Sequence, residues 1–193
     1  LSIRLECTLR EDDPNLYVEA SLENSHCDHR LRLLIGSDIR TRHAIASQPF
    51  AIIQRDTGCE SGNWQERYRE MPVDIETTEG IIAVAEAVKA LVVNSRGMKE
   101  FQIIGSEPAT IALTLFKATG VLGRNDLDWR PGRASGINNT VVETPDAQLL
   151  KPLHFSFTVA LAVNADHLTL RQLENQAVGQ PFTYQRQSFH TLD

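Results

Sequence analysis

Apolar and polar side chains alternate along much of the chain, which is typical of strands that bury one face. Every second residue is apolar over residues 1–9, and the alternation returns over residues 16–22. Residues 11–15 separate these segments as a turn, because Pro14 fixes φ and the neighbouring Asp and Asn side chains bond to nearby backbone. The pattern predicts a β-hairpin in which Cys7 is buried on the apolar face.

Further strands are predicted at short intervals after the hairpin. The expected strands are residues 31–35, 50–54, 71–77, 111–115 and 155–163, with two short buried strands within 81–94. Residues 37–69 are otherwise polar and irregular, which indicates loop. Residues 120–148 contain four glycines and two prolines among charged and amide side chains, which predicts a long ordered loop.

One helix is expected, from about Asp166 to Ala177. Asn164 or Asp166 can cap its first turn. Leu170, Leu173 and Ala177 share one face of this helix. About nine strands with one helix and short turns indicate an all-β fold, an antiparallel β-sandwich, and residues 1–193 fit one undivided domain.

Composition restricts the partners that this chain is expected to have. Its formal net charge is −6 and no basic stripe is visible, so no nucleic-acid partner is expected. No apolar run approaches the roughly 18 residues that cross a bilayer. The longest run, residues 81–93, is interrupted by Glu86 and Lys89, so no membrane span is expected.

The cysteines point to a reducing compartment. Cys7, Cys27 and Cys59 are too few and too widely spaced for a disulfide framework, so reduced thiols and a cytoplasmic location are expected. The chain begins at Leu1 within an alternating segment, and we therefore expect it to be a piece of a longer polypeptide.

Several short clusters contain reactive side chains without the spacing of a site. Residues 26–29 (His-Cys-Asp-His) hold metal-capable groups, but adjacent residues in a turn rarely converge on one ion. Residues 58–62 place a serine one position late for a nucleophile elbow. Cys59 and a distant His could form a thiol dyad, but the sequence selects no partner. The acidic pairs at 74/76 and 126/128 fit a solvated strand face and local turn bonds.

Residues 129–136 form a different kind of segment. Trp129, Arg130 and Arg133 stand among glycines, which permit close approach, while arginine donates hydrogen bonds in a fixed planar geometry. A functional loop and a surface loop whose arginines pair with nearby acids both fit this composition.

A family resemblance runs through these residues in consistent order. The chain resembles the C-terminal β region of glycoside hydrolase family 38 α-mannosidases, including bacterial members similar to mannosylglycerate hydrolase. The matching stretches are 23–24 (EN), 28–32 (DHRLR), 92–97 (VVNSRG), 111–116 (IALTLF), 123–127 (GRNDL), 130–134 (RPGRA), 144–148 (TPDAQ) and 173–177 (LENQA) with Pro181. Residues 121–124 lack the bulkier side chain expected there, and residues 36–69 do not align.

The resemblance implies a β-sandwich of the mutarotase-like supersandwich type. Such enzymes retain anomeric configuration and use a carboxylate nucleophile, a carboxyl acid/base and a zinc ion held by His and Asp in an N-terminal catalytic α/β domain. That domain is absent from residues 1–193, so no catalytic residue, metal ligand or cofactor is expected here. A loop of the β region presents an arginine to the cleft in this family. Arg133 matches it best, and Arg130 is the alternative.

The expected role is therefore to brace the catalytic domain and complete one wall of its mannoside-binding cleft. The expected partners are that catalytic domain and, through its cleft, the mannoside; association with further copies stays open. One rival is an independent carbohydrate-binding module, which usually exposes several aromatics, whereas aromatics make up 6% of this chain. Another rival is a purely structural or oligomerisation domain.

The chain alone is expected to hydrolyse no aryl α-mannoside and to bind no stoichiometric zinc, because the catalytic domain is missing. Colorimetric activity assays and metal analysis of the purified chain test this. One tightly bound zinc per chain would contradict it.

Overall fold

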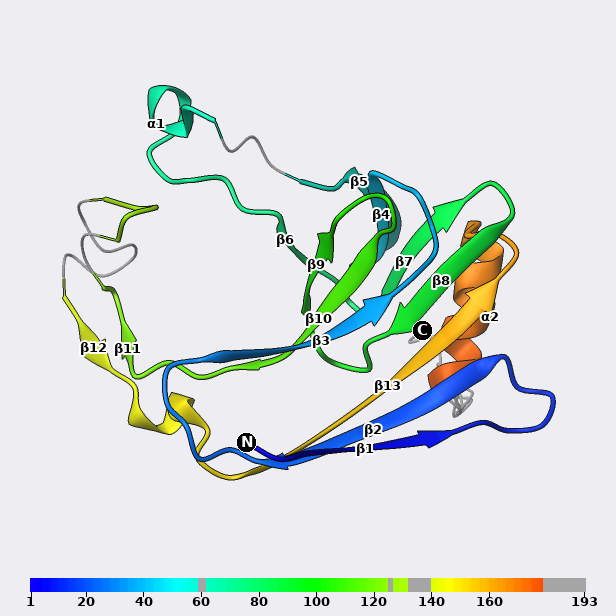
Figure 1. The fold of residues 1–193 in the computed structure, drawn as a ribbon, viewed down its shortest axis with the longest axis horizontal. Coiled ribbons are helices and arrows are strands. Elements are labelled where there is room, and N and C mark those ends of the chain that lie inside the picture. The colour runs from blue at the N-terminus through cyan, green and yellow to red at the C-terminus, as the bar shows by residue number, and fades with distance from the viewer. Residues whose placement is uncertain (59–61, 125–126, 132–139, 179–193) are drawn as a thin grey trace, which may run out of the picture.

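A computed structural model describes residues 1–58, 62–124, 127–131 and 140–178 of the chain. Within these ranges the larger of two main sheets has seven strands, and all neighbouring strands are antiparallel (Figure 1). Its strands, in spatial order, are β1 (Ile3–Thr8), β2 (Asn15–Glu23), β13 (Pro152–Ala162), β8 (Lys89–Asn94), β7 (Ile81–Glu86), β4 (His43–Gln48) and β5 (Ala51–Asp56).

The smaller main sheet has four antiparallel strands over the same described ranges. They are β3 (Arg30–Gly36), β10 (Thr110–Lys117), β9 (Glu100–Ile104) and β6 (Ile75–Thr77). The remaining elements are a two-stranded ribbon and short helices: β11 (Val121–Leu122), β12 (Val142–Glu143), α1 (Trp64–Arg67), η1 (Pro145–Gln148) and α2 (His167–Val178). The predicted antiparallel β-sandwich with one substantial helix is confirmed.

The main core lies between the two sheets. Phe157, Val93 and Val84 of the larger sheet are buried in the same cluster as Phe101, Ile111 and Leu113 of the smaller one. The strands β7 and β8 bury their other face as well, which explains why both read as nearly continuous apolar runs.

Helix α2 covers that second face of the larger sheet. Leu170 and Leu173 pack into a separate cluster with apolar residues of β7, β8 and β13. Asp166 caps the helix, since its Oδ1 accepts the backbone N–H of Thr169 at 2.8 Å, and this bond lowers the pKa of the Asp166 carboxyl. The predicted helix, its cap and its buried face are confirmed. Across the described ranges, no helix combines the length and apolar character needed to cross a membrane.

Two sequence-based expectations about residues 37–77 need correction. Residues 43–48 form the strand β4, which was expected to be loop. The pattern concealed it because Ala44 and Ala46 enter the main core while Ile45 packs on the opposite face, and alanine is a weak strand signal. The strand expected over 71–77 is only β6, and Val73 is exposed.

The prediction that Cys7 is buried is wrong. All six residues of β1 are exposed, Cys7 included. The hairpin itself is correct, because β1 pairs with β2 along its whole length. The smaller sheet has fewer strands than the larger one and leaves β1 uncovered. Cys27 is also free and exposed, and Cys59 lies outside the described residues.

Replacing Leu170 with alanine is expected to lower the free energy of unfolding by about 2–5 kcal/mol, because it leaves a cavity between α2 and the sheet. Leu168→Ala in the same helix is the control: Leu168 is 69% exposed, and the change should stay within about 0.5 kcal/mol. Urea unfolding of both variants measures the difference. Equal effects would mean that α2 does not pack on the sheet.

Candidate functional site

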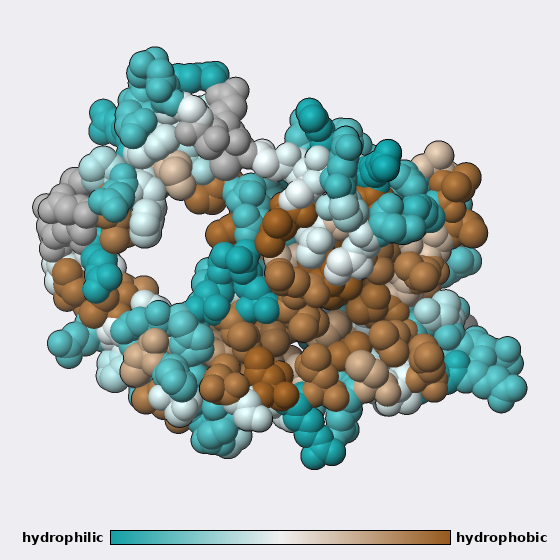
Figure 2. Space-filling view, in the orientation of Figure 1, coloured by the Kyte–Doolittle hydropathy of each residue, from teal (hydrophilic) through white to brown (hydrophobic). Residues whose placement is uncertain are grey.

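A segment that we call the arm, residues 118–149, leaves the sandwich at one end. Its described parts carry β11, β12 and η1, which lie apart from both main sheets (Figure 1). The space-filling view shows an opening between this side of the molecule and the sandwich (Figure 2). The arm contains Trp129 and Arg130 of the predicted functional segment, so its attachment decides where these two residues are held.

A closed set of hydrogen bonds fixes the base of the arm. Asp28 Oδ1 accepts the backbone N–H of Gly120 at 2.7 Å and Nε2 of Gln148 at 2.9 Å. The Oε1 of Gln148 in turn accepts the backbone N–H of Asp28 at 2.8 Å. The hydrogen bond from Gln148, then that from Gly120, and the charge of Arg124 lower the pKa of the Asp28 carboxyl.

Gly120 allows this close packing. A Cβ at position 120 would lie 2.5 Å from Nε2 of Gln148 and 3.3 Å from Oδ1 of Asp28. Any side chain there would push the amide group away from the carboxylate. The glycine therefore permits the approach on which the anchor depends.

Asn24 fastens the other end of the arm. It is buried, and its Nδ2 donates to the carbonyl oxygens of Gln148 at 3.0 Å and Leu149 at 3.1 Å. Leu149 has a φ of 53°, which ends η1 in the left-handed region. Both ends of the arm are thus held by residues of the turn between β2 and β3.

The His26–His29 turn, which contains the metal-capable cluster, has a structural role through Asp28. The His29 ring packs edge-on against Phe116 with centroids 5.1 Å apart, and against His26 at 6.4 Å. In the part of the chain that the structure describes, no three His, Cys, Asp or Glu side chains are placed to hold one metal ion.

A groove of about 500 Å³ opens at the base of the arm. Asp28, Arg124 and Arg130 supply its charges, and Val121 and Leu127 part of its apolar wall. Guanidinium groups beside one carboxylate suit hydroxyl or carboxylate oxygens of a small ligand. The groove is open to solvent, so a further surface would be needed to enclose a sugar.

The two predicted site residues fare differently. Arg130 borders the groove, and one of its terminal guanidinium nitrogens donates to the carbonyl oxygen of Arg124 at 3.3 Å. Its backbone N–H donates to the carbonyl of Leu127 at 2.9 Å, so the residue closes a tight turn. Arg133, the first choice, lies outside the described residues, as does Asp126.

A hydrogen bond that the sequence did not indicate joins the arm to a segment far away in the sequence, residues 62–74. The backbone N–H of Met71 donates to the carbonyl oxygen of Trp129 at 2.8 Å. Residues 62–74 thereby meet the predicted functional segment, although about 60 positions separate them. Trp129 remains half exposed. A backbone bond of this kind has no sequence signal.

Polar side chains on the smaller sheet are bonded to one another. Glu100 accepts a hydrogen bond from Thr114 at 2.9 Å and pairs with Arg30 at 3.3 Å and with Lys117. Burial would raise the pKa of Glu100, but the bonds from Lys117 and Thr114 outweigh it and lower that pKa. Of the acidic pair at 74/76, Asp74 accepts from Gln102 and Glu76 pairs with Arg55, which are structural contacts.

Comparison with known proteins finds relatives by sequence and by fold, although no family model matches the sequence. A protein of Halalkalibacterium halodurans with the provisional name of mannosylglycerate hydrolase is 24% identical over 148 residues, which cover 77% of this chain and 14% of that protein. An α-mannosidase of Enterococcus faecalis superposes with a TM-score of 0.72 and 22% identity over 90% of this chain. A family 38 glycosyl hydrolase from the same organism gives 0.67, with 20% identity over 90%.

This chain has the fold of a part of family 38 α-mannosidases. The resemblance expected from the sequence is therefore confirmed. The chain spans only 14–18% of the length of these relatives, so it corresponds to one region of much longer polypeptides.

Replacing Asp28 with alanine is expected to free the base of the arm, because Gly120 and Gln148 lose a shared acceptor. Hydrogen exchange at the amide of Gly120 should become faster in this variant. Glu143→Ala on β12 is a control in the same arm, since that side chain is exposed.

The pH dependence of the same protection identifies the carboxylate. A lowered pKa means that the contribution of Asp28 is present above its unfolded value of about 3.9 and is lost as pH falls through the folded value. The protection factor of Gly120 should therefore drop in strong acid in the original protein and be flat in Asp28→Ala. A drop of the same size in both would show that Asp28 does not hold the arm.

Proposed function

We propose that this chain is an accessory β-sandwich domain of a retaining α-mannosidase. Its role is to brace the catalytic domain and to contribute the arm to one wall of the substrate cleft. The observation that carries the proposal is the fold match to an α-mannosidase with a TM-score of 0.72 over 90% of the chain. The arm adds support, because it leaves the sandwich and places Arg124 and Arg130 next to a groove.

The chemistry of the parent enzyme belongs to a catalytic domain. Retaining glycosidases use one carboxylate as nucleophile and a second carboxyl group as acid and then base. In this family a zinc ion would hold sugar hydroxyls there. In this proposal the zinc ligands lie in the catalytic domain, and this chain's part is to bind and orient. We place the parent in the cytoplasm as part of this proposal, where thiols stay reduced.

The substrate proposed for the parent is an α-mannoside, with mannosylglycerate as a candidate because one relative carries that name. A glycerate group has a carboxylate, and arginine binds carboxylates with two parallel hydrogen bonds. An arginine of the arm would bind that carboxylate or the sugar oxygens. A free-standing carbohydrate-binding module usually exposes a planar set of aromatic rings. Among the described residues, the exposed rings of Phe50, Tyr68 and Trp129 make no ring contact with one another, which disfavours that alternative.

In the full-length enzyme, Arg133→Ala is expected to lower kcat by about 10²–10³, the typical loss of one donor that stabilises developing charge. Arg130→Ala identifies the alternative donor. Arg10→Ala, in the turn where the guanidinium stacks on Tyr17 at 4.1 Å, is the control and should leave kcat unchanged. Steady-state kinetics on an aryl α-mannoside and on mannosylglycerate measure these effects. Near-original kcat and KM in both arm variants would mean that the arm is only structural.

A further inference from the structure

The edge strand β1 presents an apolar stripe, which we define as Ile3, Leu5 and Cys7. In the register of the hairpin these residues lie opposite Leu22, Ala20 and Val18. Those three partners are buried in the main core, so the stripe continues the core face of the sheet. Yet Ile3 is 42% and Leu5 is 48% exposed. The apolar face of the larger sheet therefore extends beyond the part that is covered.

The smaller sheet does not reach this part of the larger one. It supplies four strands against seven over the described ranges, and β1 lies at the end of the larger sheet. The same shortage is seen at Leu161, which pairs with Leu91 on the core face and is 78% exposed. Apolar surface is visible across this face of the larger sheet (Figure 2). Contiguous exposed apolar surface is a common feature of interfaces.

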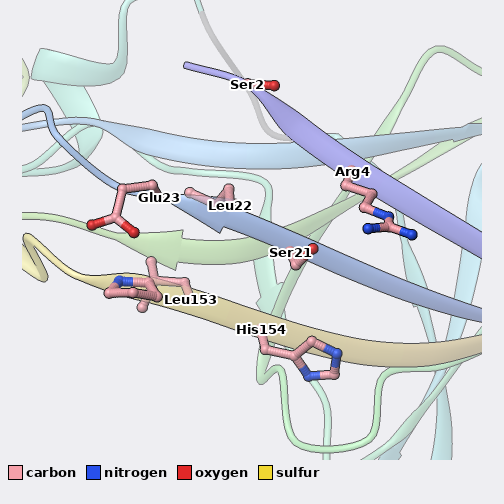
Figure 3. A pocket seen from close by; sticks show the side chains of 8 residues that line it. Ser2, Arg4, Ser21, Leu22, Glu23, Leu153 and His154 are labelled. Atoms are coloured by element: carbon pink, nitrogen blue, oxygen red, sulfur yellow. The ribbon is translucent and has the colours of Figure 1, made fainter.

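The edge of β1 lacks two of the features that keep sheet edges from pairing, a proline and a β-bulge. The strand has no proline, and its register with β2 is continuous from Ile3 to Thr8. Its charges, Arg4 and Glu6, lie on the opposite face and pair with each other at 2.6 Å. Close by, Arg4 lies with Ser21 and His154 across three neighbouring strands (Figure 3). The unpaired backbone N–H and C=O groups of such an edge are a template for another strand.

We infer that the stripe and the free edge of β1 bind a β-strand from the remainder of the same mannosidase polypeptide. That strand extends the seven-stranded sheet and covers Ile3 and Leu5. The inference rests on the proposed function. The occupant follows from length: the matched region is 14–18% of each relative, so most of the relatives' chain lies outside it and is tethered to it. A tethered strand is present at a high effective concentration, whereas a separate partner is not.

Cys7 reports on this cover directly. Cys7 and Cys27 are both exposed in this chain, so without a cover both thiols should react readily. In the native full-length enzyme, Cys7 should react with N-ethylmaleimide at least about tenfold more slowly than Cys27, because modification then requires local opening. Mass spectrometry of pulse-labelled peptides reads each cysteine separately, and Cys27 is the internal control.

A pair of variants separates cover from other causes of protection. Leu5→Lys in the full-length enzyme should restore fast labelling of Cys7, since a charge on the stripe opposes docking. Thr8→Lys on the opposite face of β1 is the matched control and should leave the protection intact.

The possible outcomes are distinct. An active enzyme whose Cys7 reacts as fast as Cys27 overturns the inference and leaves the proposed function standing. An inactive full-length protein overturns the proposed function instead. Protection that disappears on dilution, with a dimer in sedimentation, assigns the stripe to a second copy and also overturns the inference.

Discussion

The burial of β7 and β8 on both faces is the constraint on which the rest of the structure depends. Ile82 and Val84 face the smaller sheet, whereas Ile81 and Ala83 face α2. Because two apolar faces cannot be solvated, the centre of the larger sheet needs a sheet on one side and a helix on the other. The outer strands, which carry polar residues on one face, need less cover.

Periodicity predicted much of this fold because it reports which residues share a face. The hairpin, the strands β3, β7, β8, β10 and β13, and the cap of α2 all follow from local pattern. Periodicity cannot report whether a face is covered, which is why Cys7 was placed wrongly. It also fails where both faces are apolar and the side chains are small, as in β4.

The candidate site was predictable only in part. Composition directed attention to residues 129–136, and Arg130 does border a groove. The anchor joins Asp28 to Gly120 and Gln148, residues about a hundred positions apart, and no local rule connects them. A cluster first considered for metal binding thus has a different use, since its aspartate holds a loop by hydrogen bonds.

The position of β13 has a consequence for how the chain is made. Within the described residues, β13 lies between β2 and β8, so the β1–β2 hairpin joins the rest of the larger sheet only through the last described strand in chain order. On the ribosome the hairpin must wait for more than a hundred further residues before its inner edge is paired. Contacts of such long sequence separation slow folding and prolong the exposure of apolar edges. A nascent chain that stops before Pro152 would have the β1–β2 hairpin and the strands β8, β7, β4 and β5 without hydrogen bonds between the two groups.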